Sequence, residues 1–341
     1  MKHLLLLYNF FLKSKKMKVL VTGANGLLGH HVVSELLKRK HIVRIILRGS
    51  RNIYFDMSEV ESINGDFTHY ETIKIAAEDC DAIIHIAAVT ATNLLHYKDY
   101  SNINVDGVAQ IIKVAEELKI NKLVFVSSAN TIGYGIKQQL ADERSTIEFP
   151  FSKSFYAQSK LEAEQLIIEA SKKPNQHVVI VNPTFMLGAY DSKPSSGKLL
   201  ILGYKRKLMF TPKGGKNFVA VSDVATAVCN AIIQGKNGER YLTSGVNYSF
   251  KEYYKLQKQV GIYKQFIIEI PDFLLISIGI VGDMLRKFGI KTNLCSMNLR
   301  QLMIREYYNN QKAKNELNLP DTNLKMAINE AIDWFKEKGM I

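Results

Sequence analysis

The stretch KVLVTGANGLLG, residues 18–29, decides the fold of this chain. An apolar, β-branched run typical of a buried strand passes directly into three glycines, and residues 27–38 then repeat apolar side chains at helical spacing. We expect the first glycine to permit a tight turn, the second to let backbone approach a pyrophosphate, and the third to let helix and strand pack closely. The pattern T-G-x-x-G-x-x-G between a strand and a helix therefore predicts a dinucleotide-binding turn. Its predicted cofactor contacts are Gly23, Asn25, Gly26, Leu27, Leu28 and Gly29.

Apolar strands alternate with amphipathic helices from residue 18 to about residue 181, and beyond Pro183 the pattern loosens into mostly helical segments. Such alternation predicts an α/β fold, a Rossmann-type doubly wound parallel sheet with a smaller, mostly helical C-terminal substrate domain. We expect a leader outside the fold at 1–16, an NAD(P)-binding domain at 17–182, and a substrate-binding region at 183–341, some of whose segments return to the first domain. The expected strands are 18–21, 42–47, 81–86, 123–127 and 177–181, and the expected helices are 27–38, 105–118 and 159–169.

Composition narrows the class of protein. The 341 residues are 47% hydrophobic and 23% charged, which is typical of a globular protein and excludes a disordered chain. Three scattered cysteines predict no disulfide framework and no metal site, so we expect a reducing, cytoplasmic location. The net charge of +13 favours anionic ligands. Because no run of Lys and Arg is interleaved with aromatic residues, we expect no nucleic-acid partner.

Residues 1–16, MKHLLLLYNFFLKSKK, carry a short apolar run flanked by lysines. The run is too short to span a bilayer, which takes about 20 apolar residues, and no small-residue cleavage site follows it. We interpret Met17 as the natural start of the protein. The alternative is a peripheral membrane anchor helped by the lysines.

The end of the second expected strand bears on the choice of cofactor. NAD-specific sites usually place an Asp or Glu there, but residues 37–54 hold no carboxylate. Arg48, with Arg44, Ser50 or Arg51 nearby, could instead hold a 2′-phosphate through charge-assisted hydrogen bonds. We therefore predict NADP(H) in preference to NAD(H), although a solvated loop would also explain these arginines.

Asp66 ends the following segment, in the run Asn64-Gly65-Asp66. Its carboxylate is positioned to bond the adenine amino group of a dinucleotide. The alternative is an ordinary turn or a helix cap.

Tyr156 and Lys160 form a Y-x-x-x-K pattern, and residues four apart share one face of a helix. A phenol has a pKa of about 10, and a nearby ammonium group favours the phenolate. Such a tyrosine can serve as a general acid or base on a hydroxyl or carbonyl. Ser127 and Ser128 end a buried strand, where open α/β sheets bind ligands. Surface decoration of a helix and capping of a strand end are the alternatives.

Seven short motifs occur in a fixed order along the chain. They are T-G-x-x-G-x-x-G at 22–29, G-D at 65–66, H-I-A-A at 85–88, N-V-D-G at 104–107, V-S-S at 126–128, Y-x-x-x-K at 156–160 and N-P-T at 182–184. The ordered set resembles the extended short-chain dehydrogenase/reductase family. This group contains NDP-sugar epimerases and dehydratases, dihydroflavonol reductases and 3β-hydroxysteroid dehydrogenases.

The resemblance implies roles for the matching residues. Ser128 matches the residue that hydrogen-bonds the reacting oxygen, Tyr156 matches the catalytic acid or base, and Lys160 matches the residue that binds the nicotinamide ribose and tunes the tyrosine. Other matching positions lie on the cofactor side: Ala87 and Ala88 in a turn against the cofactor, Ser127 beside it, Pro183 near the nicotinamide ring, and Asn104 in a supporting role.

The resemblance implies an NAD(P)-dependent oxidoreductase. Arg48 and the helical second domain favour the dihydroflavonol-reductase-like branch, with hydride transfer between NADP(H) and a secondary alcohol or ketone. One alternative is an NDP-sugar epimerase or dehydratase with tightly bound NAD, whose diphosphate donors would come from Lys198, Lys205, Arg206 or Lys216. Another is a non-catalytic, cofactor-binding regulatory protein.

Two partner surfaces are also expected. The family often forms dimers through helices such as 105–118 and 159–169, so a homodimer is expected. The apolar stretch 273–281 is interpreted as a core or lid helix, or as a lipid-facing helix near a steroid-like substrate, which leaves peripheral membrane contact open.

Overall fold

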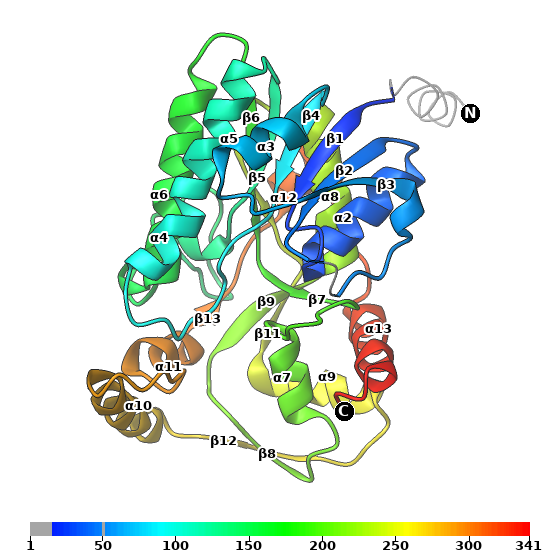
Figure 1. Ribbon diagram of the computed structural model, residues 1–341. Helices are drawn as coiled ribbons and strands as arrows, with labels where there is room; N and C mark the ends of the chain where they lie inside the picture. The colour runs from blue at the N-terminus through cyan, green and yellow to red at the C-terminus, as the bar shows by residue number, and fades with distance from the viewer. Residues whose placement is uncertain (1–15, 50–51) are drawn as a thin grey trace.

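The segment quoted first forms strand β1 (Lys18–Thr22) and helix α2 (Leu27–Lys38) at the centre of the fold (Figure 1). The structure is a computed structural model that describes residues 16–49 and 52–341. Residues 1–15 of the expected leader therefore lie outside the described residues, and so do the candidates Ser50 and Arg51. Helix α2 has the predicted bounds.

Seven parallel strands form the main sheet, in the order β3-β2-β1-β4-β5-β6-β10. The strands besides β1 are β2 (Ile42–Leu47), β3 (Val60–Asn64), β4 (Ala82–His85), β5 (Lys122–Val126), β6 (His177–Pro183) and β10 (Arg240–Thr243). This topology confirms the predicted doubly wound sheet. The strand order reverses between β1 and β4, and ligands bind at such a reversal in open α/β sheets.

Helices cover both faces of this sheet. Val19 and Val21 of β1 face the layer of α2, α8 and α12, whereas Leu20 faces the layer of α3, α5 and α6. All three side chains are fully buried, which is why the strand is apolar on both faces. The covering helices are α3 (Tyr70–Ala77), α5 (Asp106–Glu117), α6 (Phe155–Ser171), α8 (Val221–Gln234) and α12 (Gln311–Leu317), with α4 (Lys98–Asn104) beside α5 and α6.

The later part of the chain adds a second body below the main sheet (Figure 1). A small sheet contains β7 (Phe185–Leu187), β9 (Gly215–Ala220), β11 (Val246–Ser249) and β13 (Arg305–Glu306). Around it lie α7 (Gly197–Gly203), α9 (Phe250–Val260), α13 (Leu324–Glu337), the ribbon of β8 (Leu208–Thr211) with β12 (Phe266–Glu269), and the pair α10 (Asp272–Lys287) and α11 (Ser296–Met303). This body is rich in helices, as predicted, but its strands were not anticipated.

Two predicted helices have different bounds in the structure. The helix predicted at 159–169 begins at Phe155, and the helix predicted at 105–118 begins at Asp106 after the unpredicted α4. The first turn of α6 escapes a periodicity argument because its side chains are not part of the apolar stripe that packs on the sheet. As a result, Tyr156 lies within the helix.

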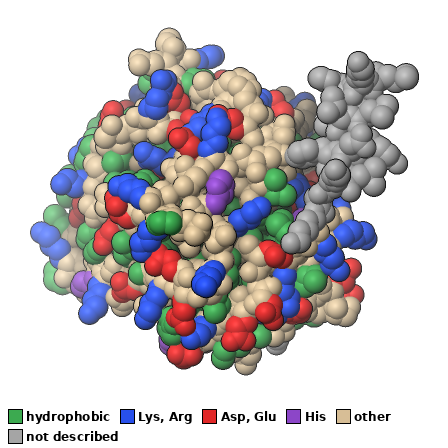
Figure 2. All heavy atoms as spheres, turned by 90° about the horizontal axis from the view of Figure 1, so that it is seen from above, with side chains coloured by type: hydrophobic (Ala, Val, Ile, Leu, Met, Phe, Trp, Pro, Cys, Tyr) green, Lys and Arg blue, Asp and Glu red, His purple; other side chains and the backbone are tan. Residues whose placement is uncertain are grey.

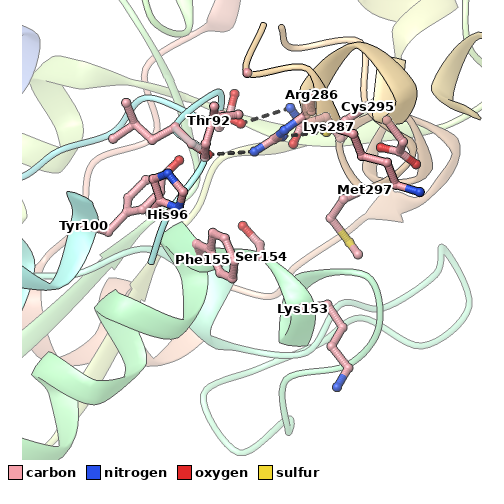
Figure 3. A pocket seen from close by; sticks show the side chains of 15 residues that line it. Thr92, His96, Tyr100, Lys153, Ser154, Phe155, Arg286, Lys287, Cys295 and Met297 are labelled. Carbon is pink, nitrogen blue, oxygen red and sulfur yellow. Dashed lines mark hydrogen bonds between the residues drawn. The ribbon is translucent and has the colours of Figure 1, made fainter. Parts of the chain in front are cut away.

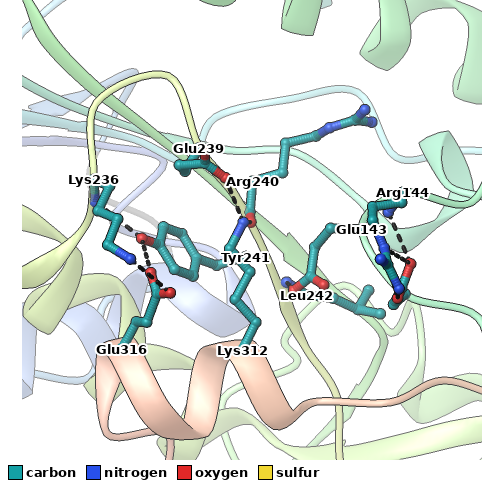
Figure 4. Close-up of polar contacts among 10 residues, drawn as sticks. Glu143, Arg144, Lys236, Glu239, Arg240, Tyr241, Leu242, Lys312 and Glu316 are labelled. Atoms are coloured by element: carbon teal, nitrogen blue, oxygen red, sulfur yellow. Dashed lines mark hydrogen bonds and ion pairs between the residues drawn. The ribbon is translucent and has the colours of Figure 1, made fainter.

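Strand β10 pairs with β6 at the edge of the sheet, and polar contacts with α12 and with Lys236 support it there (Figure 4). The Tyr241 hydroxyl donates to Glu316 Oε2 at 2.8 Å and accepts from the Lys236 N–H at 2.9 Å. Lys312 donates to the Arg240 carbonyl at 2.7 Å. These bonds satisfy a buried phenol, so a segment about 57 residues beyond β6 in sequence completes the sheet edge.

The surface at the sheet end of the molecule mixes charges of both signs. Figure 2 shows Lys and Arg side chains interspersed with Asp and Glu over this face. No helix within the described ranges is long and apolar enough to cross a membrane.

Substituting Gly29→Ala is expected to destabilise the fold. A Cβ at Gly29 would overlap the Gly23 carbonyl oxygen and lie 2.7 Å from Ala24 Cα. Overpacking of this kind costs about 1–3 kcal/mol, whereas the same change in an unhindered helix stabilises by up to about 1 kcal/mol. Chemical denaturation followed by circular dichroism would measure the difference. Ser34→Ala, at an exposed position of the same helix, is the control, and an equal or higher stability of the Gly29 variant would contradict the close packing.

Candidate active site

The turn after β1 lies against the turn after β4. Gly23 has a φ of +75°, and a Cβ there would lie 2.7 Å from the Ala87 backbone nitrogen, so only glycine fits. The Thr22 hydroxyl accepts from the N–H groups of Ile86 and Ala87 at 3.2 and 3.3 Å, and it lies 2.7 Å from His85 Nδ1. These contacts hold the carboxyl ends of β1 and β4 together at the crevice.

Helix α2 begins at this crevice. Gly26 is its N-cap residue and supplies no side-chain hydrogen bond, so the first N–H groups of the helix remain available. Such groups, with the positive end of the helix dipole, favour a phosphate. Gly29 lies one turn further and provides the close packing described above. The donor set therefore fits the pyrophosphate of a dinucleotide.

Asn104 fastens the loop after β4 to α6. Its side-chain amide donates to the Val89 carbonyl at 3.1 Å and to Ser159 Oγ at 3.0 Å, and its oxygen accepts from the Val89 N–H at 2.8 Å. The residue is buried and lies behind the cleft. It therefore supports the loop that contains Ala88.

Ser128 and Tyr156 meet at the end of β5. Ser128 begins the short 3-10 turn Ala129–Thr131, and its hydroxyl accepts from the Asn130 N–H at 3.2 Å. Tyr156 lies in the first turn of α6 and lines the same two cavities as Ser128. Burial raises the pKa of the Tyr156 phenol, and the neighbouring Ser128 side chain opposes that rise. The phenol is therefore protonated at neutral pH in the protein alone.

Lys160 lies one turn after Tyr156 and is almost completely buried. Its ammonium group donates to the Val126 carbonyl at 2.8 Å and lies 4.2 Å above the Phe125 ring. Burial lowers the pKa of Lys160 to about 7, and the nearby Glu164 carboxylate opposes that shift. A change of charge near neutral pH at this position is a property expected of a functional group.

Glu164, which the sequence reasoning missed, lies one further turn along α6 and is fully buried. Its Oε1 accepts from the Thr131 hydroxyl and the Asn182 amide, both at 2.7 Å, and Arg240 lies 3.4 Å from Oε2. The same Asn182 amide donates to the Ser128 carbonyl at 3.1 Å. Glu164 thus positions the turn that carries Ser128. Its spacing of four residues from Lys160 was the signal that could have revealed it.

Ser127 is tied to the sheet through its backbone, whereas its side chain makes no hydrogen bond among the described residues. Its N–H donates to the Val181 carbonyl at 2.7 Å, and its buried hydroxyl has no partner among the described residues. The residue also lines the cleft.

Two adjoining cavities meet at the Ser128–Tyr156 pair. The first, of about 360 Å³, runs along the glycine turn and Lys160, and the second, of about 620 Å³, lies beneath it against β7, β9 and α11. Both are lined by Ser128, Tyr156, Pro183 and Thr184. The first cavity is lined by these predicted cofactor-side and catalytic residues: Gly23, Asn25, Gly26, Leu27, Leu28, Ala88, Ser127, Ser128, Tyr156, Lys160 and Pro183.

Five predicted residues lie outside that lining: Gly29, Arg48, Asp66, Ala87 and Asn104. Thr184, from the N-P-T motif, lines both cavities. Met186 and Lys193 also line both and were not named in the prediction, because only the packing of β7 and the loop after it brings them there. Lys193, Lys198 and Lys216 give the second cavity a cationic wall, and Lys216 forms an ion pair with the buried Glu306. Lys205 and Arg206 do not line it.

Arg48 and Asp66 pair with each other at the ends of β2 and β3. Arg48 Nη1 lies 2.9 Å from Asp66 Oδ2, and the arginine side chain is 81% exposed. The other Asp66 oxygen accepts from the N–H and hydroxyl of Thr68 at 3.0 and 2.9 Å. Burial raises the pKa of Asp66, but these bonds and Arg48 outweigh it and hold the pKa below its usual value. The Asp66 side chain therefore stabilises a turn with Thr68, with or without a bound ligand.

Arg44 is engaged elsewhere. Its guanidinium lies 2.7 Å from Glu61 Oε2 and donates to the carbonyls of Ala76 and Glu78 at the end of α3. It is therefore not a free neighbour of Arg48, contrary to the prediction. The strand pairing that places Glu61 opposite Arg44 explains the difference.

No group of three or more His, Cys, Asp or Glu side chains in the described part of the chain is arranged to hold a metal ion. His85 is buried beside Lys160, and burial first, then Lys160, lowers its pKa to about 3. It is therefore neutral at ordinary pH and serves in packing.

Comparisons with known proteins agree with this geometry. The sequence profile of the NAD dependent epimerase/dehydratase family matches residues 19–243. Sterol demethylase protein B of Methylococcus capsulatus is 28% identical over 333 residues, which cover 95% of this chain and 100% of the relative. A Synechocystis protein provisionally named dihydroflavonol 4-reductase is 28% identical over 338 residues, covering 94% of this chain and 95% of the relative. The crystal structure of gox2253 has a TM-score of 0.81 at 26% identity, covering 96% of this chain and 100% of that one.

Replacing Lys160 by Met tests the burial of its amine. The unfolded chain binds this proton more tightly than the folded chain, so the native protein gains stability as the pH rises from about 7 towards 10.5. We expect Lys160→Met to be more stable than the native chain by about 2 kcal/mol or more at pH 7, and the difference to narrow by about 2 kcal/mol by pH 9. Denaturation at several pH values would measure it. The exposed Lys38→Met is the control, and a Lys160 variant that is less stable at every pH would contradict the prediction.

Proposed function

Since the chain belongs to the NAD dependent epimerase/dehydratase family, as its motifs predicted, we propose that it transfers a hydride between NADP(H) and a secondary alcohol or ketone. It is an NAD(P)-dependent oxidoreductase acting on a small molecule. The observation that carries the proposal is the Ser128–Tyr156 pair at the junction of two cavities, one bounded by the glycine turn and one free for a substrate.

The proposed chemistry assigns one task to each side chain. Ser128 donates a hydrogen bond to the reacting oxygen, and Tyr156 Oη gives that oxygen its proton or takes it away. The bound cofactor supplies or accepts the hydride. The raised pKa of Tyr156 keeps the proton on the phenol, which is the form that a ketone reduction needs. Lys160 favours the phenolate in the opposite direction.

The proposed cofactor site combines the glycine turn with the two neighbouring loops. The start of α2 would hold the pyrophosphate, Lys160 the nicotinamide ribose, and Pro183 the ring. Arg48 would hold a 2′-phosphate, for which its exposed guanidinium is accessible. Asp66 would either compete with the 2′-phosphate for Arg48 or bond the adenine amino group.

A nucleotide-sugar epimerase or dehydratase with tightly bound NAD is the second candidate. The cationic wall of Lys193, Lys198 and Lys216 favours it, because a diphosphate needs such donors. Extraction of the nucleotide from the purified chain distinguishes the two: NAD that survives dialysis would support the epimerase. A non-catalytic regulatory protein is a third candidate, which the tyrosine substitution below tests.

We further propose that residues 17–182 hold the cofactor and that 183–341 hold the substrate, with α8 and β10 contributing to the first unit. A homodimer through α5 and α6 and a cytoplasmic location complete the proposal.

Arg48→Ala is expected to weaken NADPH binding about tenfold or more, because a charge-assisted bond to a phosphate is lost, and to leave NADH binding unchanged. Titration of the full chain with both nucleotides would measure this. Arg144→Ala removes an equally exposed arginine that pairs with Asp142 and is the matched control. Equal loss for both nucleotides would rule out a 2′-phosphate contact.

Tyr156→Phe is expected to lower turnover about 10²- to 10⁴-fold while NADPH affinity stays within about threefold, since only the proton donor is removed. Rates on a panel of ketones, aldehydes and nucleotide sugars would be compared with Tyr248→Phe, a half-buried tyrosine outside both cavities. Undiminished turnover would contradict the role of Tyr156 in proton transfer. An undiminished cellular role of the variant would favour the regulatory protein.

A further inference from the structure

The ribbon of β8 and β12 presents apolar side chains outward. Its parallel register places Leu208 opposite Phe266 and Phe210 opposite Ile268. All four are exposed, Phe266 by 71%, whereas the alternate residues turn towards the protein. Side chains of a strand alternate between its two faces, and in this ribbon a row of apolar side chains lies on the face turned to solvent.

Helix α10 continues this apolar surface. Leu275, Gly279 and Gly282 are its buried positions, and the two glycines lie against the backbone of Ser296 and Leu294 at the start of α11. Ile276 is half-buried, and eight further apolar side chains of the helix and its end are exposed: Phe273, Leu274, Ile278, Ile280, Val281, Met284, Leu285 and Phe288.

The ribbon and the helix form one end of the molecule. Pro271 connects β12 directly to α10, and Figure 1 places both along the lower edge, at the end away from the mixed-charge face of Figure 2. We call this surface the apolar end, defined by the exposed residues of β8, β12 and α10 named above. A group of this size exceeds the isolated apolar residues of an ordinary surface and marks an interaction site.

Cations surround the apolar end. Residues 205–211 and 264–291 contain six exposed cations but only one exposed carboxylate, Glu269. Glu269 forms an ion pair with Lys251 at 3.0 Å. None of the six forms an ion pair with a carboxylate in the described part of the chain. They are Lys205, Arg206, Lys207, Lys264, Lys287 and Lys291.

We propose that the apolar end docks on an anionic lipid surface. Exposed Phe, Leu, Ile and Met side chains enter the boundary of headgroups and acyl chains, and the surrounding lysines and arginine meet the lipid phosphates. A second copy of the chain is a poorer occupant, because a two-fold contact through this face would bring the same unpaired cations together.

Docking would bring lipid close to the route into the active site. The last turn of α10 lines a cavity of about 520 Å³ whose lining residues Thr92 and Asn298 also line the substrate cavity. Figure 3 shows Arg286 reaching across it, where it donates to the Leu94 carbonyl at 2.7 Å and to Cys295 Sγ at 3.1 Å. The docked helix is thereby fastened to the loop after β4, so an apolar substrate could pass between the membrane and the cleft.

Vesicle flotation of the full chain tests the proposal without any activity assay. We expect binding to vesicles of phosphatidylcholine and phosphatidylglycerol, and weaker binding to phosphatidylcholine alone. The triple variant Phe273→Ser, Met284→Ser, Phe288→Ser should bind at least about tenfold more weakly to the mixed vesicles. The variant Lys287→Gln, Lys291→Gln should lose about tenfold on the mixed vesicles and little on the neutral ones.

The matched control is Ile75→Ser, Ile233→Ser, Met326→Ser, which removes three exposed apolar residues of other helices, α3, α8 and α13. Circular dichroism would verify that each variant is folded. Equal binding of the native chain and the triple variant would overturn the proposal and assign any membrane binding to another segment. Absent vesicle binding, or a native dimer that the triple variant dissociates, would likewise overturn it, the latter in favour of a contact between copies.

Discussion

The contact between the turns after β1 and β4 is the constraint on which the rest of the structure depends. At Gly23 the two backbones approach so closely that a single methyl group would separate them. Because they touch, the start of α2, the loop containing Ala88 and the end of β5 face one crevice. The hydrogen bonds of the buried Thr22 hydroxyl hold this arrangement together.

Helix α6 supplies the second half of the site through one repeated spacing. Tyr156, Lys160 and Glu164 follow each other at intervals of four residues, so they lie on one face and descend from the cleft into the core. Burial raises the pKa of the phenol, which stays protonated at neutral pH, and lowers the pKa of the Lys160 amine to about 7, so that the amine is about half protonated there. The Glu164 carboxylate opposes part of the fall in the pKa of Lys160. It also accepts the hydrogen bonds from Thr131 and Asn182 that position the turn of Ser128.

The two ends of the molecule have different surfaces. The sheet end mixes charges of both signs, as water-exposed surfaces do, whereas the apolar end combines large side chains with unpaired cations. The cleft lies between them.

Local patterns in the sequence determined the helix 27–38 and the strand 42–47, because each depends on neighbours within a few residues along the chain, and the alternation of such elements indicated the parallel sheet. Strand β10 joined the sheet, Arg44 turned to Glu61, and Glu164 met Asn182 only in the folded chain. The segment 273–281 illustrates what the sequence leaves open, since an apolar helix has the same sequence pattern in a core, in a lid and at a membrane contact. Only tertiary packing decides which of its faces are covered, because burial is set by partners that lie far away in sequence.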